Sequence, residues 1–322
     1  MNNKTSSVIA EFWHEFLKHS SKSVIVAAPA KINLVLEIVG TDDEGYHRLS
    51  TVFQALELAD ELMLSYSEAT TIDIVDNVGR GFKVEANENN LVIKAQRALE
   101  RHCQRELPCD IRLVKTIPAG GGLGGGSADA AAMLNGLNAL YDLQLGDDEM
   151  LAIAATIGSD VPFAVMGGTA LGTGRGEKLT QLPTTLAPYR VVLVTPSEGL
   201  STPTVYAHWD KMAPEKRSVA KGKAQRFADL ARLPGSLINA SLATLSNDLQ
   251  PAAFELYPEL AQIHQAMMQA GCVTAMLCGS GSTMFGLIEP HLTPDQIHAI
   301  EQELSKWGRV TVTGIRSRSI QP

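Results

Sequence analysis

The sequence predicts an α+β fold in two domains, and three observations support this prediction. Apolar residues alternate in some segments, as in strands, and recur with helical spacing in others. A run at 120–126, with six glycines in seven positions, separates a predicted strand from a predicted helix. A second series of strands and helices begins after about residue 188, and 322 residues are enough for two domains.

The predicted N-terminal domain spans residues 23–178 and begins with extended segments. Residues 23–40 are typical of strands with a break at Pro29, and residues 47–66 are extended with a turn near Ala59 and Asp60. The remaining predicted elements are a helix at 90–103, a strand at 109–118, helices at 127–141 and 147–158, and a glycine-rich hairpin at 167–179.

Residues 179–322 form the predicted C-terminal domain, which contains no internal repeat. Its predicted elements are a strand at 189–196, a helix at 251–271, two strands joined by a glycine turn at 272–288, a helix at 294–308 and a closing strand at 309–317. Residues 213–227 are charged and weakly patterned, which predicts a mobile insertion.

The first 22 residues precede both domains and are predicted to be an amphipathic helix. Five apolar residues share one helical face, namely Ile9, Phe12, Trp13, Phe16 and Leu17. This stretch has no sustained apolar core and no small-residue cleavage site, so it is not a signal peptide. The four cysteines have no disulfide or zinc spacing and are expected to pack as reduced thiols. We therefore expect a cytoplasmic protein.

Charge and hydropathy exclude two classes of partner. The formal net charge is −8 and the isoelectric point is about 5.5, which argues against a general nucleic-acid binder. No apolar run approaches the roughly 20 residues that a membrane-spanning helix needs. An anionic ligand would need a local positive site, and the sequence makes no prediction about oligomeric state.

The glycine run at 120–126 predicts a phosphate-binding loop. Glycine adopts positive φ and lets a ligand approach the backbone, and the N-terminus of the helix that follows offers unpaired N–H groups. Ser127 can cap this helix or reach a phosphate or its metal ion. Asp129, in the predicted first turn, is expected to interact with the helix dipole.

Other glycine-rich phosphate loops fit less well. A Walker A loop needs a lysine that this run lacks. The GxGxxG spacing at Gly120, Gly122 and Gly125 is a weak signal, because no convincing second strand ending in an acid follows. The HRD and DFG motifs of protein kinases are also missing.

One family pattern fits better. "PAGGGLGGGS", residues 118–127, resembles the phosphate loop of the GHMP kinases, which phosphorylate small alcohols. Within that superfamily, residues 29–56, residues 157–177, "LSNDLQP" and "CGSGSTMFG" resemble the 4-diphosphocytidyl-2-C-methyl-D-erythritol kinases. The resemblance runs from about residue 23 to near the C-terminus, is weak at about 214–237, and leaves out the first 22 residues.

This resemblance implies a two-domain GHMP kinase fold with the active site in the cleft between the domains. It implies phosphorylation of the 2-hydroxyl of 4-diphosphocytidyl-2-C-methyl-D-erythritol in the non-mevalonate isoprenoid pathway. The substrates would be that alcohol and ATP with Mg²⁺, with no tightly bound cofactor. Two alternatives stay open: a GHMP kinase for homoserine, mevalonate or a sugar, and a non-catalytic nucleotide-binding regulator.

The family's catalytic pair falls on Lys31 and Asp160. Without the resemblance, Lys31 could be a lysine whose side chain extends from an apolar strand to water, and Asp160 could be an ordinary turn aspartate. The resemblance implies that Asp160 accepts the proton of the alcohol while Lys31 keeps Asp160 ionised and stabilises the transferring group.

The remaining predicted site residues bind the two substrates. The resemblance assigns ATP binding to Pro118, Gly120, Gly121, Gly122, Leu123, Gly124, Gly125, Gly126 and Ser127. It assigns binding of the cytidylated alcohol to Asn33, Tyr46, His47, Phe53, Tyr206, Gly279, Ser280 and Gly281, with Tyr46 and Tyr206 stacking on the cytosine. No residue is assigned as a metal ligand, and the Ser127 hydroxyl is the one protein group considered for Mg²⁺.

Overall fold

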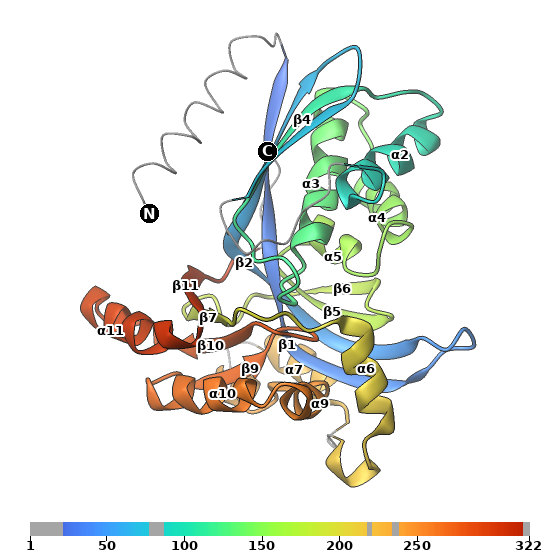
Figure 1. Cartoon of the computed structure of the whole chain (residues 1–322). Coiled ribbons are helices and arrows are strands. Elements are labelled where there is room, and N and C mark those ends of the chain that lie inside the picture. The colour runs from blue at the N-terminus through green and yellow to red at the C-terminus, as the bar shows by residue number, and fades with distance from the viewer. Residues whose placement is uncertain (1–21, 77–86, 218–220, 234–237, 318–322) are drawn as a thin grey trace.

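The computed structural model describes residues 22–76, 87–217, 221–233 and 238–317. These residues form two β-sheets, of seven and four strands, with helices packed against them (Figure 1). The predicted α+β class is confirmed. The predicted helix at the N-terminus lies outside the described residues, apart from Lys22. No helix in the described part of the chain is long and apolar enough to cross a membrane.

The larger sheet has the strand order β3-β4-β2-β1-β8, and β5 pairs with β2 and with β6. Its strands are β1 (Ser23–Thr41), β2 (His47–Tyr66), β3 (Thr71–Asp76), β4 (Cys109–Lys115), β5 (Thr169–Gly174), β6 (Lys178–Leu182) and β8 (Ser246–Asn247). The smaller sheet has the order β11-β7-β10-β9. Its strands are β7 (Arg190–Thr195), β9 (Thr274–Leu277), β10 (Met284–Ile288) and β11 (Arg309–Gly314).

Helices cover both sheets. Those of the first half of the chain are α2 (Leu91–Cys103), α3 (Gly125–Leu140), α4 (Asp147–Ala155) and α5 (Val161–Met166). Those of the second half are α6 (Thr202–Lys211), α7 (Lys223–Ala231), α8 (Ile238–Leu242), α9 (Gln250–Leu256), α10 (Glu259–Gln269) and α11 (Pro294–Leu304). The predicted domain boundary at 178/179 falls where β6 begins, and the smaller sheet starts at β7; the division into domains stays a prediction.

The β1–β2 hairpin connects the two halves of the molecule. Its strands pair over nearly their whole length, from Ser23 opposite Ser65 to Thr41 opposite His47. Figure 1 shows the hairpin running from the half that carries α2, α3 and α4 to the half that carries α6 and α9. Residues on β1 and β2 can therefore contribute to a site that both halves share.

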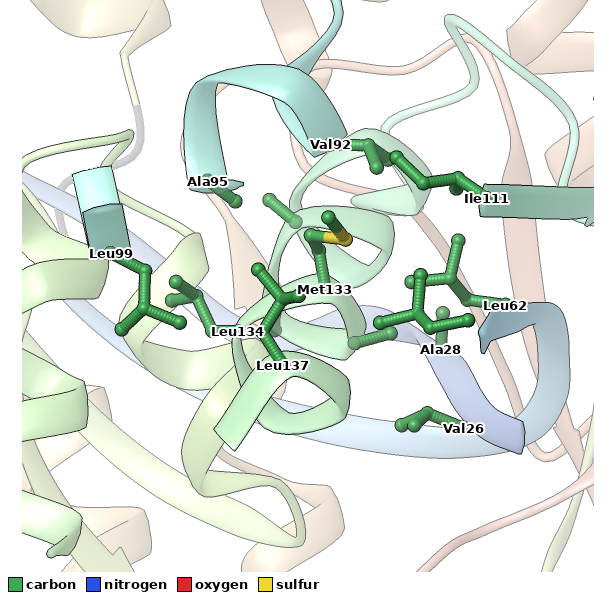
Figure 2. Packing of buried hydrophobic residues seen from close by; sticks show 14 of the residues in the cluster. Val26, Ala28, Leu62, Val92, Ala95, Leu99, Ile111, Met133, Leu134 and Leu137 are labelled. Atoms are coloured by element: carbon green, nitrogen blue, oxygen red, sulfur yellow. The ribbon is translucent and has the colours of Figure 1, made fainter. Parts of the chain in front are cut away.

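A buried apolar cluster fixes α2 and α3 against the larger sheet. In Figure 2, side chains of α3 lie between those of α2 and those of the strands. The labelled residues are Met133, Leu134 and Leu137 of α3, Val92, Ala95 and Leu99 of α2, and Val26, Ala28, Leu62 and Ile111 of the sheet. Burial of these side chains fixes the position of α3, the helix that begins at the glycine loop.

Two predicted interruptions of the first strands are wrong. At Pro29 the strand continues, with only a shift of register between Pro29 and Lys31. At Ala59 and Asp60 there is no turn, because both residues pair with β1 inside β2. Asp60 is fully buried: its carboxylate forms an ion pair with Lys115 and accepts the backbone N–H of Ile117 at 2.7 Å.

Several other predictions need correction. The N-cap of α3 is Gly124 rather than Ser127. The predicted helix at 251–271 is two helices, α9 and α10, because Pro258 interrupts the backbone hydrogen bonding. The charged segment 213–227 contains the start of α7, with Phe227 fully buried and Glu37 accepting the backbone N–H of Lys223 at 2.9 Å. Helix α6 was not predicted.

The cysteine prediction is confirmed for the described residues. All four thiols are free, with Cys109, Cys272 and Cys278 buried and Cys103 half-buried. Burial raises the pKa of Cys109 to about 12 and that of Cys272 likewise to about 12. These thiols are therefore packing groups rather than nucleophiles.

The ion pair of Asp60 generates a prediction about stability. We expect Asp60→Ala to lower the free energy of unfolding by about 3 kcal/mol or more. The substitution leaves two backbone N–H groups without an acceptor, and Lys115 loses one of its two carboxylate partners. Urea denaturation measures the change. The exposed Asp73→Ala, on β3 of the same sheet, is the matched control. A loss below about 1 kcal/mol for Asp60→Ala would contradict this role.

Candidate active site

The structure brings Lys31 and Asp160 together, although they are far apart in the sequence. Lys31 lies on β1 and is 8% exposed, and Asp160 precedes α5 as its N-cap residue. The Lys31 Nζ lies 3.2 Å from Oδ2 of Asp160. The side chain of Asp160 is 34% exposed, so a ligand can reach its carboxylate. The pair thus places an ammonium group and an accessible carboxylate side by side.

Asn33 completes the surroundings of the Lys31 ammonium. Its side-chain oxygen accepts a hydrogen bond from Lys31 Nζ at 2.9 Å. The amide orientation is fixed, because its Nδ2 donates to Thr51 Oγ1 at 2.8 Å and that hydroxyl donates to the carbonyl of Val35 at 2.6 Å. Asn33 therefore orients the Lys31 ammonium. Both ends of the Asn33 amide have protein partners, which leaves less of the Asn33 side chain free to bind a substrate.

The glycine loop packs directly on Lys31. The Lys31 backbone N–H donates to the carbonyl of Leu123 at 2.9 Å. Gly120, Gly122 and Gly124 have φ between 70° and 79°. A Cβ on Gly124 would lie 2.9 Å from Lys31 Cγ, and a Cβ on Gly122 would lie 2.0 Å from the carbonyl oxygen of Cys278. Only glycine therefore fits at Gly122 and Gly124 without a local rearrangement.

A cavity of about 320 Å³ lies between the loop and the start of α2. Its lining consists of Asn89, Asn90, Leu91, Lys115, Ile117, Asp129 and residues 118–126. All the predicted ATP-binding residues except Ser127 line it. Residues 89–91 were not among the predicted site residues. The sequence feature that could have indicated them is the predicted helix beginning at residue 90, because the N-terminus of that helix lines this cavity.

A buried ion cluster supports the loop from beneath. Lys115 forms ion pairs with Asp60 and with Asp129, and all three side chains are at least nine-tenths buried. Asp129 is the fifth residue of α3 rather than part of its first turn, so the expectation of a helix-dipole partner is wrong. Burial raises the pKa of Asp129 above its ordinary value, and its Oδ1 has no hydrogen-bond partner among the described residues.

The turn between β9 and β10 closes the site from the other half of the molecule. A Cβ on Gly279 would lie 3.4 Å from Lys31 Nζ, and the backbone N–H of Thr283 donates to the carbonyl of Gly121 at 3.2 Å. Asn247 Nδ2 donates to the carbonyl of Gly279 at 2.7 Å, and the Ser280 hydroxyl bonds that of Thr202 at 2.7 Å. The turn at 279–281 thus contacts the glycine loop and the lysine.

Tyr46 lies at the tip of the β1–β2 hairpin and is 58% exposed. The guanidinium of Arg175 covers one face of its ring, 4.0 Å from the centroid. Arg175 is held there by Asp42 and Glu44, each at 2.7 Å. Arg175 was not among the predicted site residues, because its partners come from a different hairpin.

His47 and Tyr206 lie side by side. Their ring centroids are 4.8 Å apart with an interplanar angle of 30°, and Trp209 meets His47 edge-on at 5.7 Å. His47 Nε2 lies 2.8 Å from Asp210 Oδ1. Burial raises the pKa of Tyr206, so its phenol stays neutral. No ring contact joins Tyr46 with Tyr206 in the described residues, which leaves them as two separate aromatic surfaces.

The predicted contact of Phe53 with a base is corrected. Phe53 is 1% exposed, and its ring stacks on that of Phe163 at a centroid distance of 4.8 Å. Lys31 Nζ lies 5.5 Å from the Phe53 centroid. The ring is therefore part of the core beneath the lysine, since it has no exposed surface for a ligand.

Within the described ranges, no group of three His, Cys, Asp or Glu side chains is arranged to hold a metal ion.

Family models match both halves of the chain. Residues 90–168 match the GHMP kinases N terminal domain, and residues 223–309 match the GHMP kinases C terminal domain. The chain is 42% identical over 289 residues to a 4-diphosphocytidyl-2-C-methyl-D-erythritol kinase of Nocardia farcinica, covering 88% of this chain and 90% of the relative. It is 39% identical to the kinase of that name of Moorella thermoacetica, covering 87% and 95%.

Solved structures share the fold. A crystal structure of 4-(cytidine 5'-diphospho)-2C-methyl-D-erythritol kinase matches with a TM-score of 0.71 and 32% identity, over 91% of this chain and 99% of that one. A homoserine kinase from Cytophaga hutchinsonii matches with a TM-score of 0.70 over 92% and 96%, but at 20% identity this likeness concerns the fold alone.

The contact between Gly124 and Lys31 predicts the effect of one added methyl group. We expect Gly124→Ala to weaken binding of a non-hydrolysable ATP analogue by about 5- to 30-fold, because the strained φ and the contact with Lys31 Cγ displace the loop. Calorimetry measures the affinity. Gly222→Ala is the matched control, since Gly222 also has positive φ but no atom within 4 Å of its Cβ position. Equal affinities in both variants would show that the loop does not cradle the nucleotide.

Proposed function

Because the chain belongs to the GHMP kinases and, among them, to the 4-diphosphocytidyl-2-C-methyl-D-erythritol kinases, we propose that it transfers the γ-phosphoryl group of ATP to the 2-hydroxyl of that cytidylated alcohol. This reaction belongs to the non-mevalonate route to isoprenoid precursors. The observation that carries the proposal is the Lys31–Asp160 pair, which lies directly against the glycine loop. A cytoplasmic location is part of the proposal.

Asp160 acts as the base in this proposal. A tertiary alcohol is a poor nucleophile, so its proton must pass to an acceptor as the oxygen attacks phosphorus. The carboxylate of Asp160 is exposed enough to meet the alcohol and is held by Lys31. The Lys31 ammonium holds the Asp160 carboxylate in place before transfer and stabilises the charge of the phosphoryl group during transfer.

The cavity beside the loop is the proposed nucleotide site. The loop amides and the N-terminus of α3 would bind the phosphates, as helix N-termini commonly do. The apolar side chain of Leu91 and the polar side chains of Asn89 and Asn90 would contact the nucleoside part. The nucleotide would thus bind mainly through atoms of the first half of the chain. Asp160 and the alcohol would meet its γ-phosphate on the side of the loop that packs against Lys31.

The lining of this cavity fits the Mg²⁺ that accompanies ATP. Asp129 offers one buried carboxylate oxygen, Oδ1, that no described group occupies, and oxygen ligands are those that Mg²⁺ prefers. Ser127 does not line the cavity, so Asp129 replaces it as the proposed protein ligand. When bound, Mg²⁺ would neutralise phosphate charge.

The aromatic surfaces at Tyr46 and Tyr206 are the proposed site for the cytosine. Tyr46 comes from the β1–β2 hairpin and Tyr206 from α6, so the acceptor would bind across both halves. His47, which follows Tyr46 in the sequence and contacts Tyr206, would form a hydrogen bond with the edge of the base. Homoserine, mevalonate and galactose have no base to stack on these rings, which favours the cytidylated alcohol over them.

One assay tests the proposed function as a whole. ATP consumption is measured with the cytidylated alcohol and, in parallel, with homoserine, mevalonate and galactose. We expect turnover only with the first. Turnover with another acceptor would identify a different GHMP kinase, and turnover with none would favour a nucleotide-binding regulator.

We expect Asp160→Asn to fold normally and to lose about 10²- to 10⁴-fold in kcat, because asparagine cannot accept the proton. The exposed Asp148→Asn, on α4, is the matched control and should retain wild-type kcat. Thermal melting and ATP affinity check that the fold and the nucleotide site are intact. A near-normal kcat in folded Asp160→Asn would exclude Asp160 as the base.

The two aromatic surfaces generate a prediction about the acceptor. Tyr46→Ala and Tyr206→Ala should each weaken binding of the cytidylated alcohol by about 5- to 150-fold, the range of one base–aromatic stack. The double variant should lose more than either single one, though less than the sum, because both rings contact the same ligand. Calorimetry measures both affinities, with ATP affinity as the internal control. Unchanged acceptor affinity in both single variants would remove the stacking site.

A further inference from the structure

The pair of His47 and Asp210 fixes which ring nitrogen of the histidine carries a proton. Their Nε2 and Oδ1 atoms lie 2.8 Å apart. A carboxylate only accepts hydrogen bonds, so in a neutral imidazole the proton must be on Nε2. Nδ1 is then an unprotonated acceptor, and no described group donates to it. The histidine thus presents a lone pair rather than an N–H.

The ring is also held against rotation. Tyr206 covers one face of His47, and Trp209 meets its edge at an interplanar angle of 87°. The side chain of His47 is only 14% exposed. A half-turn of the ring would exchange Nε2 with a carbon and break the bond to Asp210. The orientation and the tautomer are therefore both set by residues of α6.

A lone pair at Nδ1 discriminates between pyrimidines. Cytosine carries a 4-amino group, which donates, whereas uracil carries a 4-carbonyl oxygen, which only accepts. An amino group facing Nδ1 forms a hydrogen bond, and a carbonyl oxygen there places two lone pairs in contact. A buried group left without its partner costs more than the bond itself contributes.

We propose that Asp210 is a positioning residue that holds His47 as its Nε2–H tautomer, so that Nδ1 selects an acceptor bearing an amino-substituted base over the uracil analogue. This inference rests on the proposed function, since it assumes that His47 faces the base. Asp210 itself does not touch the acceptor in this arrangement, and its side chain is 51% exposed. Its replacement is therefore expected to leave the fold intact.

Nitrogen-15 NMR of histidine-labelled protein at pH 8 tests the tautomer without any substrate. Histidine side chains are ordinarily neutral at this pH, and the two tautomers have distinct nitrogen shifts. His47→Gln assigns the signal. We expect the wild type to show the Nε2–H form and Asp210→Ala to show a mixture of both. A wild-type proton on Nδ1, or no change in Asp210→Ala, would overturn the inference.

Kinetics test the selectivity. The ratio of kcat/KM for the cytidylated alcohol to that for its uridylated analogue should fall by about 10-fold or more in Asp210→Ala. The KM for ATP and the kcat at saturating cytidylated alcohol should stay unchanged, which a general structural defect would not allow. An unchanged ratio would overturn the role of Asp210 in selection.

The same helix offers a matched control. His208, also on α6, has its Nε2 at 2.9 Å from Oε2 of Glu255 on α9, which makes a second histidine–carboxylate pair. Glu255→Ala should leave the selectivity ratio and the His47 spectrum unchanged. If the wild type fails to phosphorylate the cytidylated alcohol, the proposed function and the selection of its base both fail. The NMR spectrum then still supports or overturns the tautomer on its own.

Discussion

The glycine loop packs so closely on two other segments that no side chain fits between them. A Cβ on Gly122 would overlap the carbonyl of Cys278, and one on Gly124 would press on Lys31. Backbone hydrogen bonds from Lys31 to Leu123 and from Thr283 to Gly121 hold the three segments together. Because of this contact, the lysine of β1, the glycine loop and a turn from the smaller sheet converge at one place.

The buried charges beneath the loop complement this packing. Asp60 of β2 forms an ion pair with Lys115 and accepts the backbone N–H of Ile117. Asp129 of α3 forms an ion pair with the same lysine. Such a cluster is costly to bury, and its bonds set one geometry for the strand, the loop and the helix. A pre-organised cradle lowers the cost of binding an anion, because its N–H groups need no rearrangement.

Much of this site could be predicted from local pattern and family resemblance. The glycine loop, the helix after it and the Lys31–Asp160 pair all follow from short motifs. The ion cluster could not be predicted, because Asp60, Lys115 and Asp129 meet only through tertiary packing. Phe53 was wrongly assigned to the base-binding site because it is aromatic and close to Tyr46 in the sequence. On β2 its side chain faces the core instead. Arg175 and Asp210 were missed since their partners lie on other hairpins or helices.

A crystal structure with a non-hydrolysable ATP analogue and the cytidylated alcohol tests the proposed catalytic arrangement most directly. We expect the phosphates against the loop at 120–126, the γ-phosphate beside Lys31 Nζ, and the 2-hydroxyl within about 2.6–3.2 Å of the Asp160 carboxylate. A 2-hydroxyl that lies out of reach of Asp160, or nucleotide phosphates bound away from the glycine loop, would contradict it.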